Sequence, residues 1–347
     1  MIISGPCSAE TRRQVVETAK QLDKITQVQV FRAGVWKPRT RPGSFEGAGV
    51  KALEWLKEVK EKTRLKVAVE VATAMHVEQA LKHGVDILWI GARTTVNPFS
   101  VQAVADALRG VDVPVLVKNP LNPDLYLWVG ALERVYGAGV RRLAAVHRGF
   151  FPFEKTHLRN VPKWEIAIEL KSKFHNLPII CDPSHMAGDS AFIESLAQKS
   201  LDLDLDGLMI EAHIDPQNAL SDAGQQVTPA QLKVILENLR HRVVDVKDRD
   251  YRNILEDIRG QIDSIDRTIL ETLAQRDRLV RRIGKEKMKR NISVLQLERW
   301  EQMRSDRLII AGKLGLDEKF VKNLLELLHK ESIVLQFEAM LDERRLQ

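Results

Sequence analysis

The chain has 347 residues, a formal net charge of +6 and two cysteines, Cys7 and Cys181. Because the charge is modest and Lys and Arg are interspersed with Asp and Glu, the composition argues against a dedicated nucleic-acid-binding protein. Two cysteines do not make a disulfide scaffold and favour a reducing, cytoplasmic location, and no run suits a membrane span or signal peptide. The first expected strand begins at Ile2, which leaves no room for an N-terminal regulatory domain.

Eight short apolar runs recur along the first part of the chain, and each ends in polar side chains. Helical patterns separate them, among them Arg13–Ile25, Ala48–Thr63, Val101–Leu108, Pro162–Phe174 and Pro229–Arg240. Eight such units in roughly 250 residues are typical of an α/β fold, the (β/α)8 TIM barrel, whose chemistry lies at the C-terminal strand ends. The runs are IISGPCS from Ile2, QVFRAG from Gln29, KVAVEVAT from Lys66, ILWIGAR from Ile87, PVLVKNP from Pro114, RLAAVHRG from Arg142, IICDPSH from Ile179 and GLMIEAH from Gly207.

The pattern changes near residue 245, after which no strand pattern occurs. Three helical patterns follow, approximately Asp250–Arg290, Gln296–Lys313 and Glu318–Leu346. Long helices joined by short turns are typical of an all-α domain. We therefore expect a barrel over residues 1–245 and a three-helix domain over residues 246–347.

Four residues at strand ends or in the following loops are candidate metal ligands: Cys7, His185, Glu211 and Asp222. One thiolate, one imidazole and two carboxylates suit Mn, Fe, Co or Zn better than Mg or Ca. His213 competes with His185 for the imidazole position. Each residue could also be an ordinary polar strand-end residue, so spacing alone only suggests the site.

A second set of strand-end residues is cationic. Because a barrel gathers its strand ends at one rim, these groups would repel one another unless anions bind between them. Phosphate is the natural anion, since arginine forks match its oxygens. The alternative is solvated loop charge. The residues are Arg32, Lys37, Arg39, Arg41, Arg93, Lys118 and Arg148.

The motifs in this region occur in a specific order. They are GPCS at Gly5–Ser8, KPRT at Lys37–Thr40, GAR at Gly91–Arg93, Lys118 with Asn119, HRG at His147–Gly149, DPSH at Asp182–His185, and IEAH followed by SDAGQQ at Ser221–Gln226. Over residues 1 to about 240 this order resembles the 3-deoxy-D-arabino-heptulosonate 7-phosphate (DAHP) synthases of the short type I subgroup. Asn119 differs from the KRG expected there. The resemblance implies metal-dependent condensation of phosphoenolpyruvate with erythrose 4-phosphate, the first step of the shikimate pathway to the aromatic amino acids.

The resemblance also assigns roles to residues. It implies that Cys7, His185, Glu211 and Asp222 bind the metal, and that Lys118 donates a proton or positions water. Arg32, Lys37, Arg93, Lys118 and Arg148 would hold phosphoenolpyruvate, and Arg39 with Thr40 the phosphate of erythrose 4-phosphate. The related synthase that uses arabinose 5-phosphate usually reads KANR, so Pro38 and Thr40 favour erythrose 4-phosphate.

The first long helix of the second domain has an apolar seam that two cations interrupt. Stepping by sevens from Ile262 places Arg276 where the seam should be apolar, and Lys287 lies four residues beyond Ile283. A buried unpaired cation costs several kcal/mol, so both require an anionic ligand. The alternatives are a solvated charged face or a nucleic-acid-binding helix, although the latter lacks interleaved aromatic residues.

The segments IRGQIDSID and LAQRDRLVRRIGKEK, followed by LHKESIVLQ, resemble the AroQ-type, all-α chorismate mutases over about residues 250–340. This implies a Claisen rearrangement of chorismate to prephenate, in which Arg276, Lys287 and Gln336 act on the reacting groups. Trp300 replaces an expected glutamate, and Gln296 an expected aspartate. The implied substrate contacts are Arg259, Arg276, Lys287, Arg299, Ser332 and Gln336.

Helix geometry adds an expectation about assembly. Arg259 and Arg276 are seventeen residues apart (276 minus 259), or roughly 25 Å along one helix, and point about 100° apart. One small dicarboxylate cannot meet both from a single helix. If both are used, Arg259 comes from a second chain, which makes the domain an intertwined dimer.

We therefore expect a bifunctional homo-oligomer, at least a dimer, with phosphoenolpyruvate, erythrose 4-phosphate, chorismate and prephenate as its ligands and a divalent metal as its cofactor. Neither nucleic acid nor membrane is an expected partner. Prephenate or chorismate bound to the helical domain is expected to inhibit the synthase allosterically. The alternative is a DAHP synthase with a non-catalytic dimerisation or sensor domain.

Overall fold

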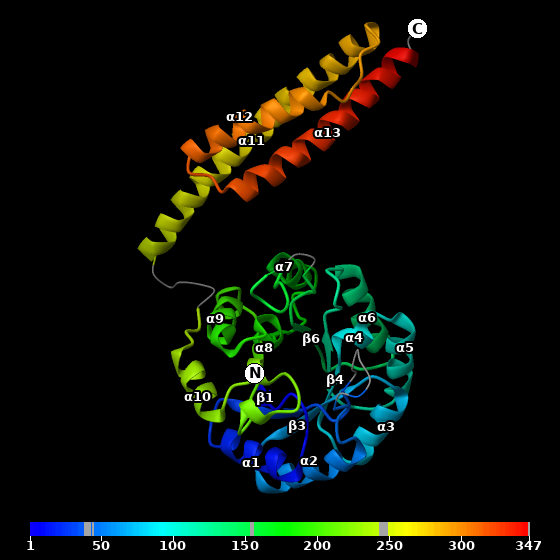
Figure 1. The fold of residues 1–347 in the computed structure, drawn as a ribbon, viewed down its shortest axis with the longest axis vertical. Coiled ribbons are helices and arrows are strands. Elements are labelled where there is room, and N and C mark those ends of the chain that lie inside the picture. The colour runs from blue at the N-terminus through cyan, green and yellow to red at the C-terminus, as the bar shows by residue number, and fades with distance from the viewer. Residues whose placement is uncertain (38–42, 44, 153–155, 243–248, 346–347) are drawn as a thin grey trace. The chain divides into compact units, whose positions relative to one another are not determined.

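The computed structural model describes residues 1–37, 43, 45–152, 156–242 and 249–345. The chain divides into two compact units, Met1–Val244 and Asp245–Gln347 (Figure 1). The boundary expected at residue 245 falls outside the described residues. Among the described residues, none of the helices is both long and apolar enough to cross a membrane.

The first unit is a closed barrel of eight parallel strands, in which each strand pairs with the next and β8 pairs with β1. The expected (β/α)8 barrel is thus confirmed. Each of the eight strands lies within, or one residue from, the apolar run that predicted it. The strands are β1 (Ile2–Gly5), β2 (Val28–Ala33), β3 (Lys66–Val71), β4 (Ile87–Ile90), β5 (Val115–Lys118), β6 (Leu143–His147), β7 (Ile179–Cys181) and β8 (Gly207–Glu211).

Helices surround this barrel (Figure 1). Several begin at a side chain that accepts a hydrogen bond from the first turn, such as Thr11 before α1 and Asp124 before α6. Thr228 and Gln231 form a capping box at the start of α10. The helices are α1 (Arg12–Asp23), α2 (Val50–Lys62), α3 (Ala74–Lys82), α4 (Ala92–Thr95), α5 (Pro98–Ala107), α6 (Leu125–Gly137), α7 (Trp164–Lys173), α8 (Pro183–Ala187), α9 (Ile193–Asp202) and α10 (Pro229–Asn238).

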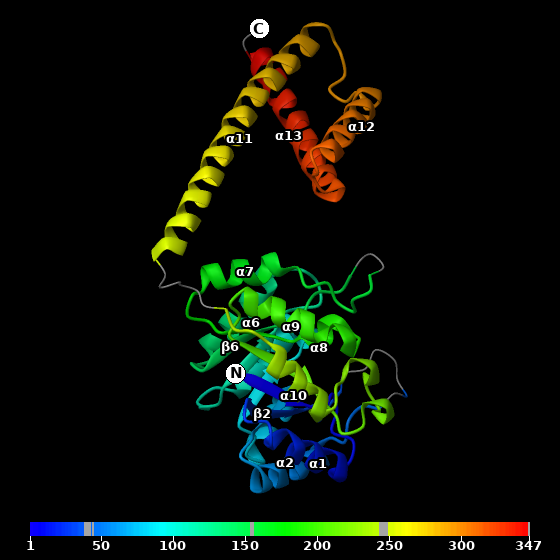
Figure 2. The ribbon, with the colours of Figure 1, turned by 90° about the vertical axis from the view of Figure 1, so that its left-hand side faces the viewer.

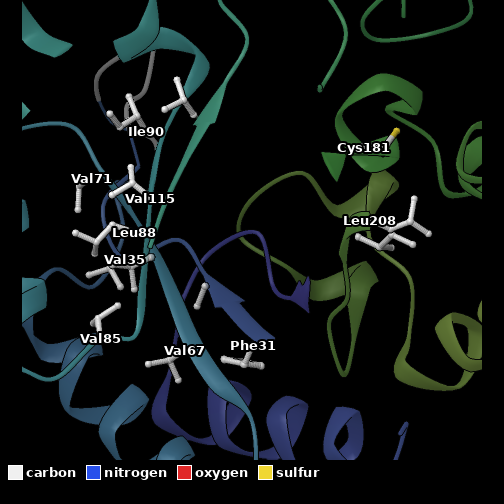
Figure 3. Close-up of a cluster of buried hydrophobic side chains, with 14 of the residues drawn as sticks. Phe31, Val35, Val67, Val71, Val85, Leu88, Ile90, Val115, Cys181 and Leu208 are labelled. Carbon is white, nitrogen blue, oxygen red and sulfur yellow. The ribbon is translucent and has the colours of Figure 1, made fainter. Parts of the chain in front are cut away.

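Strand residues alternate between two cores because successive side chains point to opposite faces. On β3, Val67, Val69 and Val71 belong to the larger core between sheet and helices, and Ala68 to the core inside the barrel. Figure 3 shows part of the larger core, with Val67, Val71 and Leu88 among the labelled side chains. The inner core is Ile3, Val30, Ala68, Ile87, Trp89, Leu116, Ala144, Val146, Ile180 and Met209.

The residues two positions beyond this inner core form the next layer toward the C-terminal strand ends. The same alternation turns them toward the barrel axis, where Trp89 forms the floor beneath Arg32 and Lys118, whose cationic groups lie 4.9 and 5.9 Å from its ring centroid. This layer is therefore mostly polar and lies directly on the apolar inner core. Its members include Arg32, Glu70, Gly91, Lys118, Arg148, Asp182 and Glu211.

The second unit consists of three helices: α11 (Arg249–Lys289), α12 (Leu297–Lys313) and α13 (Glu318–Arg345). The expected all-α domain is confirmed. The C-terminal half of α11 and all of α12 pack on α13, whereas the N-terminal half of α11 extends beyond the other two helices (Figure 2). Gly284 permits the close approach, because a Cβ there would lie 2.8 Å from the Gln336 carbonyl oxygen.

Candidate active sites

Three of the four expected metal ligands converge at the mouth of the barrel. One ligand atom from each of Cys7, Glu211 and Asp222 lies within 4.8 Å of the others. They come from the loop after β1, the end of β8 and the loop after β8, which the closure of the barrel brings together. His185, on α8, places Nε2 3.7 Å from Glu211 Oε1.

Asp182 holds His185 in a conformation suited to metal binding. The Asp182 carboxylate caps α8 by accepting from His185 N at 3.1 Å, and it lies 2.8 Å from His185 Nδ1. When Nδ1 donates to Asp182, Nε2 keeps its lone pair. Burial also lowers the pKa of His185, which favours the neutral ligand form. His213, the competing imidazole, instead has Nε2 3.7 Å from Glu10 and accepts from Asp215 N.

Three cations face the metal-ligand cluster. Lys37 Nζ lies 3.0 Å from Cys7 Sγ, and Arg159 Nη1 lies 3.0 Å from Asp222 Oδ1. Arg32 Nη2 is 3.1 Å from Glu211 Oε1, outside hydrogen-bond geometry, so this fully buried oxygen has no hydrogen-bond partner among the described residues. An oxygen that is buried in this way is suited to a metal ion. The donor set thus fits a borderline divalent metal.

The pKa values of two expected ligands shift in opposite directions, although burial raises both. Burial, together with Glu211, raises the pKa of the Cys7 thiol to about 12. For Asp222, burial raises the pKa but Arg159 and His185 outweigh it, so the net pKa lies well below the usual range. Consistently, Cys7 Sγ donates to Asp222 Oδ2 at 3.3 Å. The cluster therefore holds a protonated thiol beside an ionised carboxylate.

Four of the expected anion-binding cations, Lys37, Arg93, Lys118 and Arg148, line a cavity next to this cluster, whereas Arg32 is not among its lining residues. Arg93 enters from α4, whereas Lys118 and Arg148 come from the ends of β5 and β6. Arg148 Nη1 donates to Asn160 at 2.8 Å, and its Nε has no hydrogen-bond partner among the described residues. Burial lowers the Arg148 pKa to about 10, which still leaves it charged at neutral pH. The cavity is lined by Lys37, Glu70, Gly91, Ala92, Arg93, Lys118, Leu121, Arg148, Arg159, His185 and Asp222.

Lys118 and Asn119 have distinct roles at the end of β5. Lys118 Nζ forms a 2.6 Å ion pair with Asp182, yet burial outweighs this partner and lowers the lysine pKa. Asn119 accepts from Arg148 N at 2.7 Å and donates to Gly149 O at 2.8 Å. Asn119, which departs from the expected motif, therefore fixes the backbone beside Arg148. Pro38, Arg39, Thr40 and Arg41 lie outside the described residues.

Several site residues were missed by sequence reasoning. Glu70 accepts from Trp89 Nε1 at 3.1 Å, and its other oxygen would lie 2.0 Å from a Cβ at Gly91, so a side chain at position 91 would displace the Glu70 carboxylate. Its position two residues beyond inward-facing Ala68 could have revealed it. Asp182 could have been found from its cap position before Pro183. Arg159 lies in a bend and Gln225 in a three-residue 3₁₀ helix, and neither is long enough to give a periodic signal.

In the helical unit, several of the expected contacts gather where α11 meets α13. Arg276 Nη2 donates to Ser332 Oγ at 2.5 Å and to Leu328 O at 3.2 Å. Arg276 Nη1 and Gln336 Oε1 are buried and have no hydrogen-bond partner among the described residues. Lys287, half-buried, donates to Val294 O at 2.8 Å. These unused polar atoms are suited to a polar ligand.

Other expected contacts lie at the edge of this cluster or away from it. Arg299 Nη1 is 3.5 Å from Gln302 Oε1, and Arg259 is exposed on the N-terminal half of α11. Trp300, which replaces the expected glutamate, stacks on His329 with ring centroids 3.9 Å apart. Burial lowers the pKa of His329, and the positive charge of the nearby Arg276 lowers it further. This ring pair occupies the position where a carboxylate was expected.

Comparisons with known proteins give a family match for each of the two units. The family model described as "DAHP synthetase I family" matches residues 1–247, and that described as "Chorismate mutase type II" matches residues 258–337. A phospho-2-dehydro-3-deoxyheptonate aldolase of Thermotoga maritima is 32% identical over 239 residues, covering 69% of this chain and 68% of the relative. A 2-dehydro-3-deoxyphosphooctonate aldolase of Desulfotalea psychrophila is 27% identical over 259 residues, covering 69% and 88%.

Solved structures match the barrel as well. The crystal structure of the Thermotoga maritima DAHP synthase has a TM-score of 0.62 at 31% identity, with 68% of this chain and 67% of that chain covered. A truncated form of the synthase from the same organism has a TM-score of 0.59 at 28% identity, with 68% and 84% covered. Sequence and structure thus lead to the same family.

Proposed function

Since the chain belongs to the DAHP synthetase I family and carries a chorismate mutase domain after its barrel, we propose that it catalyses two reactions. The barrel condenses phosphoenolpyruvate with erythrose 4-phosphate to DAHP and phosphate. The helical unit converts chorismate to prephenate. The observation that best supports the first reaction is the cluster of Cys7, Glu211 and Asp222 beside a cavity rich in arginine and lysine.

In the barrel, Arg32, Lys37, Arg93, Lys118 and Arg148 bind phosphoenolpyruvate. Their positive charges balance the negative charges of the phosphate and the carboxylate. Arg32, Lys118 and Arg148 are buried, so the low local dielectric reduces the screening of their charges. Arg39 and Thr40 bind the phosphate of erythrose 4-phosphate.

Cys7, His185, Glu211 and Asp222 would hold a divalent metal, which would supply Lewis-acid polarisation of the aldehyde. The enol carbon of phosphoenolpyruvate forms the new bond to that aldehyde carbon, water adds to the resulting cationic centre, and phosphate leaves from the hemiketal. Lys118 holds a proton close to the cationic carbon to which water adds. Its lowered pKa, caused by burial, makes it a better proton donor than an exposed lysine.

The condensation is tested by following phosphate release from phosphoenolpyruvate with purified full-length protein. Release should require erythrose 4-phosphate and should not occur with arabinose 5-phosphate, the substrate of the rival synthase. Lys118→Met should abolish release, whereas Lys60→Met, at an exposed Lys60–Asp86 pair 2.8 Å apart, should leave it unchanged. Release with arabinose 5-phosphate alone would refute the assignment of the substrate.

In the helical unit, the buried unused donor on Arg276 and acceptor on Gln336 support binding of chorismate. Arg276 and Arg299 hold carboxylates, and Ser332 orients Arg276 through its 2.5 Å contact. Lys287 and Gln336 stabilise the negative charge that develops on the ether oxygen. The bond rearrangement needs no covalent intermediate, so preorganised charge and orientation suffice.

The helical unit functions as an intertwined dimer. Ile258, Ile262, Ile265 and Ile269 form an apolar stripe on α11 that is 47–59% exposed in the single chain. A further apolar groove lined by Leu279, Ile283 and Ile292 lies on the C-terminal half of the same helix. Antiparallel pairing of two α11 helices covers both features and delivers Arg259 to the partner's Arg276.

Ligands of the helical site regulate the barrel. The proposal is supported by the covalent connection between a synthase and a unit whose ligands arise later in the same pathway. Prephenate or chorismate at Arg276 should weaken substrate binding at the barrel by about five- to 150-fold, and barrel ligands should weaken prephenate binding by the same factor. Synthase kinetics and calorimetry with added prephenate test this reciprocity. Inhibition that persists in Arg276→Ala would refute it.

A further inference from the structure

Arg159 is positioned to act on two metal ligands at once. Its Nη1 lies 3.0 Å from Asp222 Oδ1 and 2.5 Å from Gln225 Oε1. Gln225 Nε2 in turn donates to Glu211 Oε2 at 2.6 Å. One guanidinium group therefore contacts one carboxylate directly and reaches the other through a buried amide.

The side-chain amide of Gln225, which links Arg159 to Glu211, is held in one orientation. Gln225 is almost fully buried, and its oxygen and nitrogen are oriented by a donor on one side and an acceptor on the other. Glu211 Oε2 is thereby occupied by Gln225, which leaves Glu211 Oε1 as its free oxygen. The chain of contacts thus selects which oxygen of Glu211 faces the cluster.

The backbone around Arg159 is fixed to the helix that carries His185. Arg159 N donates to Ala187 O at 3.1 Å, and the neighbouring Asn160 donates from Nδ2 to His185 O at 2.6 Å. Gly188 permits this contact, since a Cβ there would lie 2.5 Å from the Arg159 Cβ and its φ is +71°. The backbone of Arg159 is therefore held in place relative to His185, and its side chain is held in place relative to the two carboxylates.

We propose that Arg159 is a positioning residue that sets the orientation of Asp222 and Glu211 for the metal. This inference rests on the metal site of the proposed function. Outer partners of ligating carboxylates restrict their rotation and typically change metal affinity about 10- to 100-fold when removed. Because the Arg159 side chain is 39% exposed, its charge is partly screened, and its main effect is geometric.

The test measures Mn²⁺ affinity by calorimetry on the metal-stripped full-length protein, without either substrate. Arg159→Gln should weaken Mn²⁺ binding about 10- to 100-fold. Arg159→Lys keeps the charge but cannot contact Asp222 and Gln225 with one planar group, so it should recover only part of the loss. The matched control is Arg142→Gln, which removes the same charge from an exposed Arg142–Asp112 pair 2.9 Å apart, between the loops that precede β6 and β5.

A second variant tests the route through Gln225. Gln225→Leu breaks the path to Glu211 but leaves the Arg159–Asp222 pair, so it should also weaken Mn²⁺ binding. In the double variant the loss should be smaller than the product of the two single losses, because both residues belong to one network. Thermal unfolding of the metal-free proteins checks that each variant is folded.

The outcomes distinguish two claims: that the barrel binds a metal, and that Arg159 positions the ligands of that metal. If the wild type binds Mn²⁺ and the Mn²⁺ affinity of Arg159→Gln is within about threefold of the wild-type affinity, the positioning role is refuted but the metal site is not. Equal losses in Arg159→Gln and Arg142→Gln would also refute the role, since net charge alone would explain them. A wild type that binds no divalent metal would overturn both proposals.

Discussion

Complementation between two inactive variants tests the shared helical site. α11 is uninterrupted from Arg249 to Lys289, so Arg259 and Arg276 lie roughly 25 Å apart along its axis. A ligand the size of chorismate cannot contact both in one chain. Arg259→Ala and Arg276→Ala should therefore each be inactive as mutases, yet a mixed dimer should contain one intact site, built from the Arg276 of one chain and the Arg259 of the other.

The expected recovery can be calculated. Random pairing of equal amounts of the two variants gives half mixed dimers, and each of these has one intact site of two, so about a quarter of wild-type activity should return. The assay is prephenate formation after co-expression with two different affinity tags. Activity no greater than that of either parent would show that each site lies within one chain. Recovery of both affinity tags in one complex is the control for formation of the mixed dimer.

Four further outcomes are expected. Cys7→Ala or His185→Ala should abolish condensation with the fold intact, and EDTA should do so reversibly, with Mn²⁺ restoring activity; full activity in excess EDTA would refute the metal site. Arg276→Ala should cost at least about 3 kcal/mol of transition-state stabilisation in mutase kinetics, the scale of one preorganised donor. Burial lowers the pKa of His147 from 6.5 to about 3, so the unfolded chain takes up a proton below pH 6.5 that the folded chain does not. Stability should fall by about 2 kcal/mol from this residue between pH 7 and pH 5, and denaturant unfolding of His147→Phe should lack that contribution. Saturating prephenate should lower wild-type synthase activity but leave that of Arg276→Ala unchanged.

The barrel and much of its mouth could be predicted because they depend on a short-range pattern. Alternation along each strand turns every second residue inward, so Arg32, Lys118 and Glu211 follow from the positions of their apolar neighbours. Closure of the barrel, which makes β1 and β8 neighbours, likewise predicts that the loops after these strands meet, so Cys7 lies near Asp222 although 215 residues separate them. Helix periodicity likewise identified Arg276 as a cation on an apolar seam.

What could not be predicted depends on irregular backbone and on contacts between distant segments. Arg159 lies in the loop after β6, where no period indicates which way a side chain points. The choice between His185 and His213 depended on the Asp182 cap and on the Glu10 contact, neither of which spacing reveals. The stacking of Trp300 on His329 joins two helices whose register the sequence does not specify.

The central claim is that this protein catalyses two reactions at two separate sites, one in each unit. The most direct measurement assays both reactions on the same purified full-length protein and on two variants. Wild type should form DAHP from phosphoenolpyruvate and erythrose 4-phosphate and prephenate from chorismate; Cys7→Ala should lose only the first reaction, and Arg276→Ala only the second. Absence of either reaction in the wild type, or loss of both reactions in either folded variant, would contradict the account.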